Sequence, residues 1–257
     1  MGINMNTEKD EQLFKKRLLE LARTAYNKNI NTYTDFLTLN EISIFYSTKP
    51  ELPDVKYELF GGFDGAERRI LCFCGDSSVK AFSDYIACLK ITPLNKKYSD
   101  DFSHRDFLGS IMNLGTTRGK IGDILVKDKE GYIYCESKLS YYLAENLEKI
   151  KHTNVRCEVI AGDAPALTPE FKEIKGSVAS PRLDAVIALA FQSSRSSILS
   201  LISGGKVFVD GRLVESNSYQ LKENETVSVR GYGKFIYNGL ENQTKKGRYY
   251  VSLSKYI

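Results

Sequence analysis

Five cationic side chains lie where predicted elements begin or end in the C-terminal third of the chain. Residues 180–234 read as two short helices followed by a small sheet, because the apolar period changes from helical spacing to two. Two arginines fall in the first turns of the predicted helices, where the helix dipole disfavours a cation. A bound anion would remove that penalty, since helix N-termini flanked by Arg forks form phosphate sites. The five cations are Arg182, Arg195, Lys206, Arg230 and Lys234.

Two interpretations of these cations are open. In the first, Arg182 pairs with Asp184 or a neighbouring carboxylate, and the other cations form a solvated basic face. In the second, they bind nucleic-acid phosphates. Residues 176–257 hold 11 Lys/Arg against 6 Asp/Glu, whereas residues 1–175 hold 25 against 26. Because the positive charge is concentrated in this segment, we favour the second interpretation and predict an RNA partner.

Local signals predict the elements that carry these cations. Pro181 is placed as a first-turn residue of the first helix. Ser194 can cap the second helix, and Gly204-Gly205 ends it. The dipeptide Asp210-Gly211 between short β-branched runs predicts a tight hairpin turn.

Residue types over about fifty positions resemble the S4-type (alpha-L) RNA-binding domain. The resemblance implies binding of structured RNA through the two helices and the adjoining loop. Asp210 is a departure, since the family often has Asn there, and both residues suit the turn. The matching strings are Arg182-Leu183-Asp184, Ser194-Arg195, Gly205-Lys206-Val207, Val209-Asp210-Gly211, Val229-Arg230-Gly231 and Gly233-Lys234. The RNA-binding positions that the resemblance implies are Arg182, Ser194, Arg195, Lys206, Arg230 and Lys234.

The chain is expected to be a multi-domain α+β protein. A length of 257 residues allows two or three small domains. We expect an N-terminal α/β domain over residues 1–78, a middle domain over 79–165 and the S4-type domain over 176–257. Residues 161–180 are rich in Ala, Pro, Gly and Ser, and they predict a linker into the last domain.

The middle segment predicts the order βαββαβ. Strands are expected over residues 85–94, 121–127, 131–137 and 155–160, with helices over 103–114 and 140–150. This order is typical of a ferredoxin-like split sheet, an architecture shared by many RNA-recognition modules.

Two sets of residues in the middle segment are candidates for RNA contact. Tyr132 and Tyr134 share one strand face and could stack on bases, although a half-buried aromatic pair is the interpretation that we favour. Arg105, Arg118 and Lys120 are expected near one end of this domain. They either extend the RNA surface or are solvated loop charges, and both readings are open.

The N-terminal segment predicts two helices and a hairpin. An apolar stripe predicts a helix over residues 8–28, and the capping box of Thr38 and Glu41 predicts a second over 39–47. The glycine-rich stretch 61–65 lacks the ending of a phosphate-binding P-loop, so it predicts a turn between two strands.

Several catalytic and cofactor classes are disfavoured. The string His104-Arg105-Asp106 copies a kinase catalytic loop, but no nucleotide loop precedes it; Ser103 and Asp106 instead form a capping box. The chain has five cysteines without a Cys-x-x-Cys pair and only two His, so we expect no zinc site, reduced thiols and no cofactor. No apolar run reaches eighteen residues and the polar start has no signal-peptide pattern, so we expect a soluble cytoplasmic protein without a membrane partner.

Two upstream strings and the S4-type segment together resemble the bacterial YlmH-type proteins. The strings are Gly61-Gly62-Phe63-Asp64-Gly65-Ala66-Glu67-Arg68-Arg69 and Phe102-Ser103-His104-Arg105-Asp106-Phe107-Leu108-Gly109-Ser110 with Lys120-Ile121-Gly122-Asp123-Ile124. The resemblance implies a protein that binds the large ribosomal subunit and tRNA and helps to rescue stalled translation. We expect it to be non-catalytic, to bind ribosomal RNA and to be a monomer when free. The alternative is an RNA-modifying enzyme, a pseudouridine synthase or a methyltransferase, that uses the S4-type domain to hold its substrate.

Overall fold

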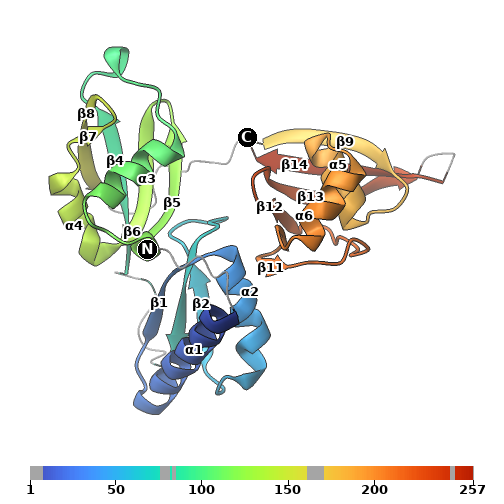
Figure 1. Ribbon diagram of the computed structural model, residues 1–257, viewed down its shortest axis with the longest axis horizontal. Coiled ribbons are helices and arrows are strands. Elements are labelled where there is room, and N and C mark those ends of the chain that lie inside the picture. Colours follow the sequence, from blue (N-terminus) through green and yellow to red (C-terminus); the bar gives the residue numbers. More distant parts are fainter. Residues whose placement is uncertain (1–7, 76–81, 83–84, 161–170, 244–246, 257) are drawn as a thin grey trace. The chain divides into compact units, whose positions relative to one another are not determined.

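The computed structural model describes residues 8–75, 82, 85–160, 171–243 and 247–256. The chain divides into two compact units, unit 1 (Met1–Ala166) and unit 2 (Leu167–Ile257). Unit 1 contains two separate clusters of buried hydrophobic residues, and unit 2 is built around a third. The protein is therefore a multi-domain α+β protein, as predicted (Figure 1).

The first part of unit 1 packs two helices on a three-stranded antiparallel sheet of order β1-β3-β2. The Glu41 carboxylate accepts the Thr38 N–H at 2.7 Å, which confirms the predicted capping box. The strands β2 and β3 confirm the predicted hairpin. The elements are α1 (Glu8–Lys28), β1 (Thr32–Leu37), α2 (Leu39–Thr48), η1 (Lys49–Glu51), β2 (Lys56–Phe60) and β3 (Arg69–Cys74).

The second part of unit 1 has the predicted βαββαβ order. Its antiparallel sheet has the order β5-β6-β4-β8-β7, which is the ferredoxin-like arrangement with a short extra strand at one edge. The elements are β4 (Ile86–Pro93), η2 (Lys96–Tyr98), α3 (His104–Asn113), η3 (Arg118–Lys120), β5 (Ile121–Lys127), β6 (Glu130–Glu136), α4 (Ser137–Asn146), β7 (Lys149–Ile150) and β8 (Thr153–Ile160).

The bounds of one helix in this part of unit 1 were predicted wrongly. The helix expected over residues 140–150 is α4, which begins at Ser137 and ends at Asn146. Residues 149–150 form β7 instead, because Lys151 adopts φ 52° and turns the chain back into β8. The capping box of Ser103 and Asp106 at the start of α3 is confirmed, with the Asp106 carboxylate accepting the Ser103 N–H at 2.7 Å.

Unit 2 is a six-stranded antiparallel sheet of order β11-β10-β12-β13-β14-β9, with two helices packed on one face (Figure 1). The turn at Asp210 and Gly211 has φ 48° and 79°, as the predicted tight hairpin requires. The elements are β9 (Phe171–Val178), α5 (Leu183–Phe191), α6 (Arg195–Ser203), β10 (Val207–Val209), β11 (Arg212–Leu213), β12 (Thr226–Val229), β13 (Gly233–Gln243) and β14 (Tyr249–Tyr256).

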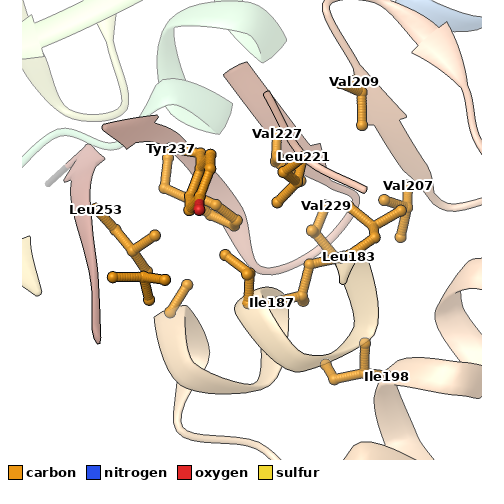
Figure 2. Close-up of a cluster of buried hydrophobic side chains, with 14 of the residues drawn as sticks. Leu183, Ile187, Ile198, Val207, Val209, Leu221, Val227, Val229, Tyr237 and Leu253 are labelled. Carbon is orange, nitrogen blue, oxygen red and sulfur yellow. The ribbon is translucent and has the colours of Figure 1, made fainter. Parts of the chain in front are cut away.

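The core of unit 2 lies between this sheet and the helices. Leu183 and Ile187 of α5 and Ile198 of α6 meet alternate residues of the strands, among them Val207 and Val229 (Figure 2). This alternation is the period-two pattern expected of strands with one buried face. The other face of β10, β12 and β13 therefore points away from the helices.

Two expectations about unit 2 are corrected. Residues 171–178, expected to be part of a linker, form β9, because they pair in register with β14 along its whole length; residues 161–170 of that expected linker lie outside the described residues. The first helix begins at Leu183, so Arg182 is its N-cap and not a first-turn residue. The Arg182 carbonyl nevertheless accepts the Val186 N–H at 3.0 Å.

The described residues were searched for metal ligands, reactive thiols and membrane-spanning helices. Within them, no group of three His, Cys, Asp or Glu side chains could hold a metal ion. All five cysteines are free, and burial raises the pKa of Cys72, Cys88, Cys135 and Cys157 to about 12, so these thiols are weak nucleophiles. No single helix in the same residues has the length and apolar content to cross a membrane. Taken together, α5 and α6 have that length and apolar content, but the pair is bent by 119°.

Candidate nucleic-acid interface

A buried carboxylate holds the two arginines of the helix N-termini. Asp184 is 1% exposed, in the first turn of α5. It accepts Nε and Nη2 of Arg182 at 3.2 and 3.1 Å, and Nη2 of Arg195 at 2.6 Å. We call these three residues the helix cluster. The pairing of Arg182 with Asp184 that one interpretation expected is therefore present.

The ion pairs do not neutralise the helix cluster. Two guanidinium groups share one carboxylate, so the cluster keeps a net positive charge. The side chains of Arg182 and Arg195 are 36% and 57% exposed, and the bonds to Asp184 take two and one of their five N–H donors. Asp184 thus orients two exposed Arg forks, the geometry that suits phosphate oxygens.

The pKa of Asp184 reflects this arrangement. Burial raises the pKa of the carboxyl, but hydrogen bonds from Arg195 and Arg182 outweigh it, so the pKa lies below the ordinary value. The carboxylate is therefore ionised at neutral pH, and it holds both guanidinium groups in place.

Ser194 caps the helix that carries Arg195. Its Oγ accepts the Ser197 N–H at 3.3 Å and lies 3.0 Å from the Ser196 Oγ. The predicted cap is confirmed, and it explains why α6 begins at Arg195. The exposed Ser194 hydroxyl adjoins the helix cluster.

The other three cations of unit 2 form a second group at the strand ends. Lys206 and Arg230 are joined through the backbone, because the Arg230 N–H donates to the Lys206 carbonyl at 2.9 Å. The Arg230 guanidinium lies over the Phe208 ring at 5.4 Å, and the Lys234 ammonium over the Tyr256 ring at 4.3 Å. A helix the length of α6 spans about 13 Å, so Arg195 and Lys206 lie near its opposite ends. The five cations thus form two groups.

Arg118 makes contacts inside unit 1. Its Nη1 donates to the carbonyls of Ile121 and Gly122, the latter at 3.1 Å, and its own carbonyl accepts Nη2 of Arg68 at 3.3 Å. Burial, reinforced by the nearby Arg68 charge, lowers the pKa of Arg118 to about 10. These contacts give Arg118 a structural role.

Lys120 is paired with carboxylates from two different strands. Its Nζ lies 2.8 Å from Oδ1 of Asp35 and 2.6 Å from Oε1 of Glu136. Although burial lowers the pKa of Lys120, these two partners raise it above the ordinary value. Lys120 therefore joins β1 to β6, whereas Arg105 is exposed in the first turn of α3.

The tyrosine pair of the middle sheet is buried, so base stacking on it is excluded in this conformation. Tyr132 and Tyr134 are 5% and 3% exposed. Phe63, from the glycine-rich loop between β2 and β3, stacks on Tyr134 with ring centroids 4.9 Å apart. We favoured a half-buried aromatic pair over a stacking site, and the structure buries the two rings more deeply than that.

The two upstream strings, residues 61–69 and residues 120–124, contact each other. The Asp123 carboxylate accepts the backbone N–H groups of Glu67 and Arg68 at 2.6 and 3.1 Å. Arg68 in turn donates through Nε to the Ile121 carbonyl at 3.1 Å and through Nη2 to that of Phe36 at 2.7 Å. The strings thus hold the glycine-rich loop against the edge of the middle sheet.

Comparisons with known proteins bear on both units. Residues 82–163 match the family described as "Putative RNA-binding domain in YlmH", and residues 181–227 match the S4 domain. The chain is also 29% identical over 259 residues to the Ribosome-associated protein quality control protein P2 of Bacillus subtilis (strain 168), covering 98% of each chain. This chain contains a YlmH-type RNA-binding domain and an S4 domain. Among solved structures, it is similar to the Cell division protein ylmH from Streptococcus pneumoniae, with 20% identity and a TM-score of 0.48, over 62% of this chain and 96% of that one.

Proposed function

We propose that this protein binds ribosomal RNA and tRNA on the large ribosomal subunit, without catalysis, in the quality control of stalled translation. The observation that carries the proposal is the helix cluster, two exposed arginines oriented by buried Asp184 inside the segment that matches the S4 domain. The name of the Bacillus subtilis relative supports the ribosomal setting.

The proposed contact is with RNA phosphates. Arg182 and Arg195 present N–H donors beside the capped start of α6, and Lys206, Arg230 and Lys234 add charge at the strand ends. Phosphate contacts of this kind dominate the affinity of most RNA-binding proteins, and they fix the position of the RNA without reading its sequence. We propose Ser194 as a neighbouring contact, and Arg105 as an accessory contact from unit 1. Because Arg118 and Lys120 make internal contacts, we propose them only as secondary RNA contacts.

A binding role is supported over RNA modification by the burial of Asp184. The string Arg182-Leu183-Asp184 has the letters of a pseudouridine synthase nucleophile. A nucleophile must reach the substrate, but this carboxylate is 1% exposed and engaged by two arginines. We further propose that the protein acts as a monomer in the cytoplasm, where ribosomes are found.

The proposal predicts salt-sensitive binding to ribosomal subunits. We expect the full-length protein to co-sediment with large subunits, and to bind tRNA in filter assays. Log K should fall linearly with log salt, by about 0.7 to 0.9 for each neutralised phosphate. Failure to bind both partners, or affinity that does not change with salt, would contradict the proposal.

The enzymatic alternative has its own test. Ribosomal RNA and tRNA are incubated with the protein, with and without S-adenosylmethionine, and examined by mass spectrometry for modified bases. A protein-dependent methylation or pseudouridine would reject the binding-only proposal.

A further inference from the structure

One end of the unit 2 sheet carries aromatic rings and cations in alternation. This end contains the turn from β12 into β13, the last residues of β14 and the first residues of β9, which lie side by side (Figure 1). We call it the aromatic edge. Its residues are Phe171, Arg230, Tyr232, Lys234, Lys255 and Tyr256, together with Phe191 of α5 and Phe208 of β10, which contact Tyr232 and Arg230.

Each of three cations at this edge lies over a ring. The Lys234 ammonium is 4.3 Å from the centroid of Tyr256, and the Lys255 ammonium is 4.7 Å from that of Phe191. Arg230 lies 5.4 Å above Phe208 on the sheet face away from the helices. Such contacts hold long cationic side chains close to the aromatic surface.

Two rings of the edge are turned toward solvent. Phe171 and Tyr232 are each 44% exposed. Phe171 packs against Tyr256 at 4.8 Å and 64°, and Tyr232 packs against Phe191 at 5.6 Å and 65°. Each exposed ring is thus supported by a second ring in an edge-to-face contact, which fixes its position and leaves aromatic surface exposed.

The charges around these rings favour an anionic partner. Phe171 and Tyr256 are directly opposite each other in the ladder, and β13 contributes Lys234 to the same end. Glu173, two residues along β9 on the same face, shares Lys175 with Glu241, at 3.2 and 2.6 Å, so the three cations of the edge outnumber the one carboxylate on this part of β9. Positive charge interleaved with exposed rings is the combination by which proteins bind single-stranded nucleic acid.

We propose that the aromatic edge binds a single-stranded segment of RNA, with bases stacked on Phe171 and Tyr232 and phosphates held by Lys234, Lys255 and Arg230. This inference rests on the proposed function and deepens it. Arg182 precedes the first residue of α5 and Phe191 is its last, so a helix of nine residues, about 13 Å long, joins one arginine of the helix cluster to one ring of the edge. Structured RNA at the helix cluster and an adjoining single strand at the edge are thus compatible.

The sequence permits a direct test, because the chain contains no Trp. Replacing Phe171 or Tyr232 by Trp introduces a single indole at the proposed stacking position, and a base stacked on it quenches its fluorescence. The probe is a labelled oligouridylate of about 12 nucleotides, a length typical of single-strand sites. Its binding to the full-length protein is followed by anisotropy while the indole emission is recorded. Tyr141→Trp, at a position 70% exposed in unit 1, is the matched control.

We expect saturable quenching in Phe171→Trp and Tyr232→Trp that follows the anisotropy curve, and none in Tyr141→Trp. The variants Phe171→Ala and Tyr232→Ala should each weaken oligouridylate binding by about tenfold, with circular dichroism confirming that they fold. Binding without quenching at either edge position would overturn the inference, as would unchanged affinity in the folded Ala variants.

Failure of this inference and failure of the proposed function give different results. No oligouridylate binding, with tRNA and large-subunit binding intact, overturns the aromatic edge alone. No binding to tRNA or to the large subunit overturns the proposed function, whatever the oligouridylate result.

Discussion

Replacement of Asp184 by Ala is expected to lower the free energy of unfolding of unit 2 by about 2–3 kcal/mol at neutral pH. The substitution removes three charge-assisted hydrogen bonds and leaves two guanidinium groups without their shared partner. The expected loss is smaller than for a fully buried ion pair, because both arginines are partly exposed and can be hydrated. Urea unfolding of the full-length protein, with hydrogen exchange of the α5 and α6 amides, measures the effect in the correct unit.

The same variant should change the pH dependence of stability. Because the folded pKa of Asp184 lies below its unfolded value of about 3.9, its contribution is present above that value. It is lost as the pH falls through the folded pKa. The difference between wild type and Asp184→Ala should therefore be full at pH 7 and shrink at strongly acid pH.

A control separates this effect from a general charge effect. Glu173→Ala removes a carboxylate of the same unit whose ion pair with Lys175 is exposed, and it should change stability by less than about 1 kcal/mol. An Asp184→Ala variant as stable as Glu173→Ala would mean that Asp184 does not organise the helix cluster.

Replacement of Gly62 by Ala is expected to destabilise unit 1 by about 2–4 kcal/mol. Gly62 adopts φ 100°, which side chains with a Cβ rarely tolerate, and a Cβ at this position would lie 2.2 Å from Cδ1 of Tyr134. The new methyl group must displace either the glycine-rich loop or the buried Tyr134 ring, and with it the Phe63 stack. Hydrogen exchange of the β6 amides and urea unfolding measure the loss.

Gly109→Ala is the matched control for this prediction. Gly109 lies in α3, and a Cβ there would meet nothing within 4 Å. Since Ala is the better helix former, this variant should be neutral or more stable by up to about 1 kcal/mol. If Gly62→Ala were equally harmless, the glycine-rich loop would not be held against the middle sheet as described.

Local signals in the sequence were sufficient for most of the fold. The capping boxes at Thr38 and Ser103 and the turn at Asp210-Gly211 depend on residues close in sequence, and all three are formed. The strand β9 was missed because its pairing with β14 joins segments more than seventy residues apart. Composition alone does not reveal such a partner, so the segment resembled a linker.

The same limit applies to the candidate site. The types of Arg182 and Arg195 could be read from the sequence, but their convergence on Asp184 depends on the angle between α5 and α6. For Arg118 and Lys120, sequence spacing showed charge near a loop but did not show that carbonyls and carboxylates surround it. The contact between the strings at Arg68 and Asp123 joins residues more than fifty positions apart, and no local sequence pattern predicts it.

Charge reversal at Arg195 and Lys206 tests most directly whether the cations of unit 2 form the RNA surface. The double variant Arg195→Glu and Lys206→Glu is compared with Lys9→Glu and Lys16→Glu, which makes the same change in net charge on exposed positions of α1. Binding to tRNA and to large ribosomal subunits is measured for both full-length variants at one salt concentration. We expect a loss of at least about tenfold in affinity for the unit 2 variant and little change for the α1 variant. Equal affinities for the two variants would contradict this expectation.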